Sequence, residues 1–192
     1  MIEHIKTFVY TIIKPTDEEW NGFADRLKTK NLKAGDILLS SGEVCNDIHF
    51  VTKGVMRLYY EKDGEEINTY FAFQNKFMSS YQSFLSREPS KYCIQAMEDC
   101  TIVSLSYEDV QHGFNNFNAW NTFGRIIAEQ FFLKQQKRVE SFLFLSAEER
   151  YLELLKTYPD IFERIPLYHI ASYLGIKGPS LSRIRKRLVK AK

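Results

Sequence analysis

The sequence has few of the residues that build metal centres and disulfide frameworks. It contains three cysteines, Cys45, Cys93 and Cys100, and only four histidines in 192 residues. The cysteines are odd in number and lack CxxC spacing, so they supply neither a zinc or iron–sulfur ligand set nor a complete set of disulfides. We interpret them as buried or partly buried thiols of a protein in a reducing compartment, and we expect no metal and no cofactor.

Long apolar runs are also missing. No stretch of about eighteen apolar residues occurs, and the N-terminal MIEHIKTFVYTIIK lacks the basic, apolar and small-residue order of a signal peptide. We therefore predict a cytoplasmic protein without a membrane partner. There is no GxSxG, P-loop, paired-carboxylate constellation or Cys/His dyad either, so we predict that the protein is not an enzyme.

What the chain does contain is enough apolar material for a core, and a charge distribution that is strongly uneven. It is 44% hydrophobic and 15% aromatic, with a net charge of +2. The last residues from Lys177 onward include no acidic residue and seven basic ones: Lys177, Arg183, Arg185, Lys186, Arg187, Lys190 and Lys192. Such segregation predicts a positive surface for a polyanion; the alternative is a solvated basic tail.

The hydrophobic pattern changes along the chain. Residues 16–28 place Trp20, Phe23 and Leu27 at helical spacing behind a Thr16/Glu19 capping box, which predicts an amphipathic helix. From about 31 to 106, short β-branched and aromatic runs alternate with turn residues, and Asp63-Gly64 between two of them predicts a hairpin. This spacing of strands is typical of an antiparallel barrel or jelly roll.

A long helical region is predicted after Ser106, which forms a capping-box pattern with Asp109. One apolar stripe follows it: Trp120, Phe123, Ile127, Phe131, Phe142 and Leu145. Because a small barrel cannot cover a helix of this length, we predict that part of its surface meets a second copy of the chain. The alternative is a helix buried entirely against its own barrel.

The C-terminal segment predicts a helix-turn-helix. Ser146 with Glu149 opens one helix; Ile170, Ala171 and Leu174 then form the inner face of another, which Gly175 ends. In the last helix, which begins at Pro179, Leu181, Ile184 and Leu188 point inward, leaving a basic outer face. An ordinary pair of antiparallel helices shares the apolar pattern but has no need of a purely basic face.

This arrangement predicts contact with double-stranded DNA. Arginine can form two hydrogen bonds to guanine, whereas lysine and serine hold phosphates on either side. We predict that Arg183 contacts a base and that the phosphate contacts come from Lys177, Ser180, Ser182, Lys186 and Arg187.

Over nearly its full length the chain resembles the cyclic-AMP receptor protein/FNR (Crp/Fnr) family of bacterial transcription regulators. The resemblance is carried by ILLSSGEVCNDIHFVTKGVMRLYYEKDGEEI and IQAMEDCTIVSLSYEDV, and by the helix-turn-helix. It implies an α+β fold: an N-terminal double-stranded β-helix (jelly roll) like the cyclic-nucleotide-binding domain, a long central helix and a C-terminal helix-turn-helix. The implied domains are 1–117, the roll with an N-terminal helix; 118–145, the dimerisation helix; and 146–192, the DNA-binding domain.

The effector site implied by the resemblance departs from the family pattern. Nucleotide-binding members carry a Gly-Glu pair and an Arg-Ser or Arg-Thr pair that hold ribose and phosphate. Ser79-Ser80 and Ser90-Lys91 occupy those positions, so the carboxylate and the arginine are missing. Arg87 and Lys91 are the remaining cations for another anion. Two alternatives stay open: the roll binds an effector other than cyclic AMP, or it binds no effector.

The DNA-binding segment also departs from the family pattern. By the family pattern, Lys177, Gly178, Pro179, Ser182 and Arg183 face the groove, and only Arg183 matches the base-reading arginine of the cyclic-AMP receptor. The recognised DNA sequence should therefore differ. Few residues follow Leu188, so a domain without the β-hairpin wing is expected. The three scattered cysteines exclude the four-cysteine iron–sulfur cluster of an oxygen sensor.

The expected partners are double-stranded DNA, a second copy of the chain, RNA polymerase as a candidate, and an unidentified small-molecule effector. Two other classes of protein have a small β-roll. A cupin-like metalloenzyme needs several histidines inside the barrel, and only His49 lies on a predicted strand. A cyclic-nucleotide-fold module that acts through protein contacts stays open as the alternative function.

Overall fold

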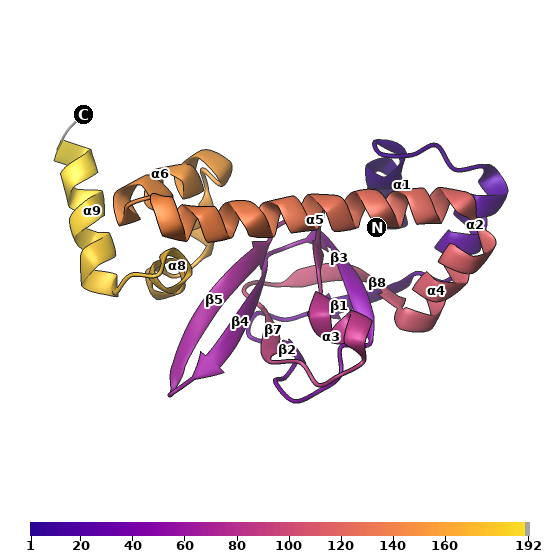
Figure 1. Cartoon of the computed structure of the whole chain (residues 1–192), viewed down its shortest axis with the longest axis horizontal. Helices are drawn as coiled ribbons and strands as arrows, with labels where there is room; N and C mark the ends of the chain where they lie inside the picture. The colour runs from indigo at the N-terminus through magenta and orange to yellow at the C-terminus, as the bar shows by residue number, and fades with distance from the viewer. Residues whose placement is uncertain (191–192) are drawn as a thin grey trace.

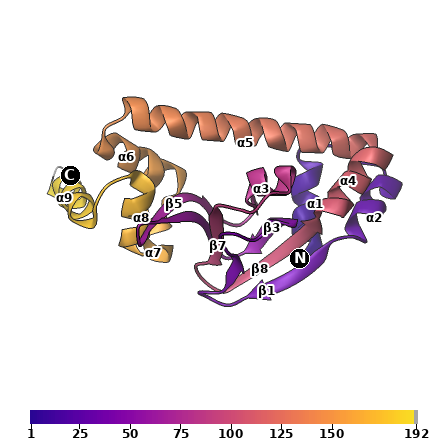
Figure 2. The same cartoon turned by 60° about the horizontal axis from the view of Figure 1, so that its bottom comes forward.

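The computed structural model describes the backbone of residues 1–190 and the side chains of residues 1–188, so the end of the predicted wingless domain lies outside the described residues. Eight strands form a roll that lies beside one long helix, and a helical C-terminal part follows beyond the roll (Figure 1). Figure 2 shows the long helix along one side of the roll. The predicted fold class is confirmed.

Two helices precede the roll. α1 (Ile2–Tyr10) was not predicted; its Ile5 and Val9 are fully buried in a cluster that includes Phe50 of the roll. α2 (Asp17–Ala24) begins with the predicted capping box, in which the Glu19 amide donates to Thr16 Oγ1. It ends earlier than expected, because the chain is already extended in β1 from Lys28.

The strands form two antiparallel four-stranded sheets, which we call the roll. The first sheet has the order β1-β8-β3-β6 and contains β1 (Lys28–Leu32), β3 (Asp47–Lys53), β6 (Lys76–Met78) and β8 (Cys100–Ser106). The second has the order β2-β7-β4-β5 and contains β2 (Ile37–Leu39), β4 (Met56–Lys62), β5 (Glu65–Ala72) and β7 (Tyr92–Ala96). Their inner faces share one core, which includes Met56, Met78, Phe84, Ile94 and Ile102.

The predicted hairpin is present between β4 and β5. Asp63 and Gly64 form its two-residue turn with φ of 53° and 75°. Two successive positive φ values match the twist of the flanking strands, and the Asp-Gly pair tolerates them at low cost.

One short helix, α3 (Tyr81–Ser86), lies between β6 and β7. Two helices, α4 (Tyr107–Asn116) and α5 (Asn118–Phe144), link the roll to the C-terminal part. Ser106 caps α4 as predicted, accepting from the Asp109 amide at 3.1 Å. α5 is about 40 Å long and runs from α4 at one end of the molecule to α6 at the other (Figure 1). No helix in the described part of the chain is long and apolar enough to cross a membrane.

The apolar stripe predicted on the long helix faces mainly inward. Trp120 and Phe123 are buried against α1, α2 and the roll, and Ile127 packs on the same cluster. Phe142, also in the predicted stripe, is 42% exposed. Further apolar side chains on the C-terminal half of α5 are exposed outside the stripe: Phe132, Leu133, Val139, Leu143 and Phe144. Spacing along the chain does not show which of these apolar side chains the roll covers.

The C-terminal part contains α6 (Ala147–Thr157), α7 (Ile161–Arg164), α8 (Leu167–Leu174) and α9 (Gly178–Lys190). The predicted capping box of Ser146 and Glu149 is present. The core of the C-terminal part is continuous with the roll. Phe71 of β5 and the adjacent Phe73 belong to the same buried cluster as Ile170 and Leu181.

Candidate nucleic-acid interface and effector cavity

The turn between α8 and α9 is fixed by its backbone. Gly175 adopts φ 68°, its amide donates to the Ser172 carbonyl, and the Ile176 amide donates to the Ala171 carbonyl, each at 3.0 Å. This pair of bonds is a Schellman motif, in which glycine supplies the left-handed residue. A Cβ at Gly175 would lie 2.7 Å from a ring atom of Phe142, so the close approach of α5 also requires glycine.

α9 has a buried and an exposed face. Leu181 and Ile184 are 1% and 7% exposed and pack on α8, where Ala171 is 2% exposed. The predicted DNA-contacting residues lie on the other side: Ser182, Arg183, Lys186 and Arg187 are exposed, Lys177 is exposed at the turn, and Ser180 is partly buried. The structure therefore brings these six residues onto one surface, which we call the basic face.

Some members of the basic face have partners within the chain. Lys177 Nζ lies 2.6 Å from Glu65 Oε1 of the β4–β5 hairpin, and Arg187 pairs with Glu148 of α6. Arg183 Nη2 donates to Ser180 Oγ at 3.2 Å. Arg185 points elsewhere, because its guanidinium packs over the Phe162 ring at 4.8 Å.

A buried polar cluster joins α8 to the roll. Arg57 of β4 is 3% exposed and binds Glu66 with two nitrogens, at 2.5 and 2.9 Å. The same guanidinium lies 2.8 Å from Nδ1 of His169 in α8. Ser172 of α8 donates to the Glu66 carbonyl at 2.6 Å and accepts from the Asn68 amide at 3.0 Å.

The electrostatics of this cluster keep His169 neutral. Burial, with a further contribution from the charge of Arg57, lowers the pKa of His169 to about 4. The hydrogen bond from Arg57 lowers the pKa of the Glu66 carboxyl. A neutral imidazole can accept from Arg57 through Nδ1, whereas an imidazolium cannot. The α8 contact with the roll therefore depends on an unprotonated histidine.

The predicted effector residues are neighbours, but their polar groups are bonded to the protein. Ser90 Oγ donates to Ser80 Oγ at 2.8 Å, and both side chains are buried. Ser79 Oγ donates to the Asp47 carbonyl at 3.2 Å. These hydroxyls are therefore satisfied within the protein.

The two predicted effector cations differ in their surroundings. Arg87 ends α3 in the left-handed region, with φ 61°, and donates to the Cys45 carbonyl at 3.1 Å. Its guanidinium also lies over the Tyr107 ring, 4.5 Å from the centroid. Lys91 is exposed. Arg87 is thus held by the protein, and Lys91 is the one cation of this group at the surface.

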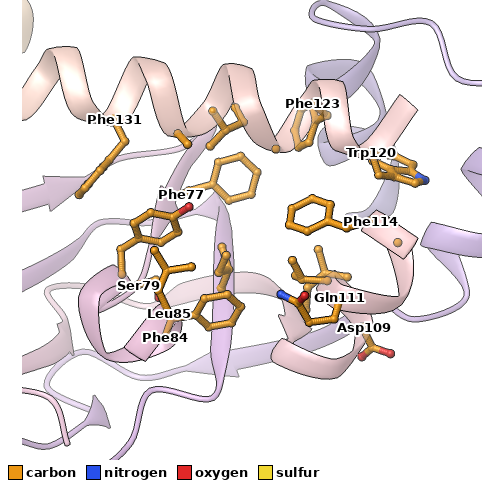
Figure 3. A pocket seen from close by; sticks show the side chains of 18 of the residues that line it. Phe77, Ser79, Phe84, Leu85, Asp109, Gln111, Phe114, Trp120, Phe123 and Phe131 are labelled. Carbon is orange, nitrogen blue, oxygen red and sulfur yellow. The ribbon is translucent and has the colours of Figure 1, made fainter. Parts of the chain in front are cut away.

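An apolar cavity of about 140 Å³ lies between the roll, α3, α4 and α5 (Figure 3). Of the five predicted effector residues, only Ser79 lines it. Its walls are mainly aromatic and include Phe77, Phe84, Phe114, Phe123 and Phe131. The sequence contained these aromatics, but the cavity depends on how three helices meet the roll, which spacing along the chain does not reveal.

His49, the one histidine on a strand, lies 2.7 Å from Ser104 Oγ, and burial lowers its pKa to about 4. Within the described residues, no three His, Cys, Asp or Glu side chains converge as metal ligands would. The three cysteines are buried free thiols, as interpreted from the sequence.

Residues 29–116 match the family model described as Cyclic nucleotide-binding domain. A search of curated proteins finds no match.

Solved structures share the fold over most of the chain. A double mutant of CooA from Carboxydothermus hydrogenoformans has a TM-score of 0.70 at 19% identity, covering 93% of this chain and 87% of its own. The c-di-GMP responsive regulator CLP from Xanthomonas campestris has a TM-score of 0.70 at 16% identity, covering 92% and 93%. A Crp/Fnr-family regulator from Eubacterium rectale reaches 0.72 at 19% identity, covering 95% and 87%. Residues 29–116 thus match the cyclic nucleotide-binding domain, in a chain with the fold of the Crp/Fnr transcription regulators.

Proposed function

We propose that this protein is a cytoplasmic, homodimeric, sequence-specific DNA-binding transcription regulator of the Crp/Fnr type and not an enzyme. The observation that carries the proposal is the basic face. It presents exposed arginine, lysine and serine side chains on the second helix of a helix-turn-helix, and residues 165–190 contain no carboxylate side chain. A helix of this kind fits the DNA major groove.

Each side chain has a proposed role. Arg183, exposed near the start of α9, reads a base, and Lys177, Ser180, Ser182, Lys186 and Arg187 hold phosphates. The ion pair of Lys177 with Glu65 does not prevent this role, because both side chains are mostly exposed, at 78% and 67%. Exposed pairs contribute little, so a phosphate can replace the carboxylate.

The division of labour follows the chain. We propose that residues 1–117 form the sensing roll, that 118–145 form the dimerisation helix and that 146–192 form the DNA-binding domain, of which 191–192 lie outside the described residues. The exposed apolar side chains on the C-terminal half of α5 support dimerisation, because contiguous apolar surface of this kind marks an interface. RNA polymerase is a further proposed partner.

The effector, if the roll binds one, is proposed to be a molecule other than cyclic AMP. An anionic phosphate needs a charge-assisted contact, and by the family pattern the position of the phosphate-binding arginine holds Ser90. This serine is bonded to Ser80, which stands at the position of the ribose-binding carboxylate.

The role of Arg183 can be tested by substitution. We expect Arg183→Ala to cost about 1–3 kcal/mol of binding to the cognate duplex and to relax preference at one base pair. Arg185→Ala is the matched control. It also removes one positive charge from α9, but the Arg185 side chain packs on Phe162 and is not part of the basic face. Fluorescence anisotropy on single-base variants of the duplex measures both.

Two outcomes would contradict this assignment. An equal loss on all duplexes for both variants would move Arg183 to the phosphate contacts. No salt-sensitive binding of wild-type protein to any duplex would favour the alternative function, a module that acts through protein contacts, because phosphate neutralisation makes DNA affinity fall steeply with salt.

A further inference from the structure

The apolar cavity is enclosed by parts of the chain that are distant in sequence. β3, β6 and α3 contribute one side, α4 closes one end, and α5 covers the other side with Phe123, Gly124, Ile127, Ala128 and Phe131. Figure 3 shows the labelled aromatic rings of both sides facing a common space beneath α5. Leu85, which is 54% exposed, lies at its edge and marks the side open to solvent.

Some polar side chains at the cavity wall are bonded within the protein. Asp109 accepts from Ser106 Oγ at 2.7 Å and pairs with Arg26 at 2.9 Å, and Ser79 is bonded to the roll. The side chain of Gln111 has no hydrogen bond to another described residue, and its amide lies beside the rings (Figure 3). The hydroxyls of Tyr70 and Tyr81 also lack a hydrogen bond to another described residue. Among the residues that the structure describes, no lysine or arginine lines the cavity.

The size and lining of this space define the ligand that suits it. A cavity of about 150 Å³ lined by aliphatic and aromatic side chains stays dry and binds benzene. The present cavity is close to that size, at about 140 Å³. A charged group would be desolvated there without a counter-charge.

The cavity is also costly to keep empty, because its lining atoms lack contacts that a filled core would provide. The wall contains Gly124 in the interior of α5, where glycine is unfavourable. A Cβ at Gly124 would lie 2.6 Å from two ring atoms of Phe114, so glycine lets this ring pack directly on α5.

We propose that this cavity binds a small, neutral, single-ring aromatic molecule with at most one hydrogen-bonding group, which Gln111 recognises. The site differs from the serine and lysine positions at which the sequence resemblance would place an effector, since only Ser79 is shared. A bound ring contacts α5 and α4 together, and α5 continues to the basic face through α6. An effect of the bound ring on DNA affinity rests on the proposed function. Binding of the ring in the cavity does not.

The test uses the full-length protein with benzyl alcohol as the probe and benzoate, of similar size but charged, as its control. Isothermal titration calorimetry should show one benzyl alcohol bound per chain, and benzoate should bind at least about tenfold more weakly. Ala128→Leu should fill the space, raise the melting temperature and abolish binding of benzyl alcohol. Lys91→Ala should bind it as wild type does.

A second measurement does not depend on the Ala128→Leu variant being folded. In methyl-labelled wild-type protein, benzyl alcohol should shift the signals of Val110 and Ile127, which line the cavity. No binding of benzyl alcohol, equal binding of benzoate, or unshifted Val110 and Ile127 signals would overturn the inference. If the probe binds the cavity and no duplex binds the protein, the site stands and the proposed function fails.

Discussion

At the residue scale, Lys134 of α5 is unusual because it is largely buried without a counter-charge. Its Nζ lies 4.2 Å from the centroid of the Tyr70 ring and 3.4 Å from the Tyr158 hydroxyl. No carboxylate lies within ion-pair distance of it among the described residues. Burial, with smaller contributions from Lys76 and Arg138, lowers the pKa of Lys134 to about 8. The charged form is thus disfavoured by folding.

We expect Lys134→Met to increase the free energy of unfolding by about 1–2 kcal/mol at pH 7, because it replaces an unpaired buried charge with an apolar side chain of similar length. The sign with pH follows from the lowered pKa. Between about 8 and the ordinary value of 10.5, the unfolded chain holds a proton that the folded chain has released, so wild-type stability rises with pH. The advantage of the variant should therefore shrink in this range.

Urea denaturation at several pH values measures this difference. Lys137→Met is the control, since Lys137 is exposed on the same helix. A variant less stable than wild type at pH 7, or an advantage that does not change up to pH 10, would contradict the account of Lys134.

His169 gives a dependence on pH of the same sign, in a lower pH range. Its pKa in the folded chain, about 4, is below its ordinary value of 6.5, so the unfolded chain binds the proton first as the pH falls. Wild-type stability should decrease from pH 6.5 towards 4, by roughly 1–3 kcal/mol from this residue. His169→Gln keeps an acceptor for Arg57 and should lose less stability over the same range. Equal losses in both proteins would show that the α8 contact does not depend on this imidazole.

At the element scale, the C-terminal half of α5 presents its exposed apolar side chains on one face. Leu143→Glu places a charge in the middle of that face, where Leu143 is 69% exposed, and we expect it to give monomers at micromolar concentration by light scattering. Asn118→Glu, at an exposed position at the start of the same helix and far from that face, should remain dimeric. A dimeric Leu143→Glu protein would place the interface elsewhere.

Local chemistry made several elements predictable. The capping boxes at Thr16 and Ser146, the Asp63-Gly64 turn and the Gly175 end of α8 each depend on residues a few positions apart, and each is present. α1 was not predicted, although Ile2, Ile5 and Val9 stand at three- and four-residue spacing on one face, the pattern of an amphipathic helix.

At the scale of the whole molecule, the sequence shows far less about which distant segments contact one another. The polar cluster joins Arg57 and Glu66 of the roll to His169 of α8, more than a hundred residues later, and neither charge pattern nor spacing predicts such a contact. The cavity has the same origin, because three helices and the roll each supply part of its wall. The basic face, in contrast, lies on one continuous helix and could be predicted.

The arrangement of the molecule suits a regulator, since α5 contacts both the cavity and the C-terminal part. Arg138 of α5 donates to the Asn68 carbonyl of the roll at 3.3 Å and to the Tyr173 carbonyl of α8 at 3.0 Å. A displacement of α5 therefore changes contacts on both sides, which is how two distant sites become coupled.

The central claim is sequence-specific recognition of DNA by a dimer, and selection of duplexes from a random library by the purified full-length protein at moderate salt tests it most directly. The account predicts enrichment of a palindromic site whose half-sites lie about one helical turn apart, with preference at one position lost in Arg183→Ala. The selection is run without a ligand and again with benzyl alcohol. Failure to enrich any sequence in both arms, with weak binding that is the same for wild type and Arg183→Ala, would contradict it.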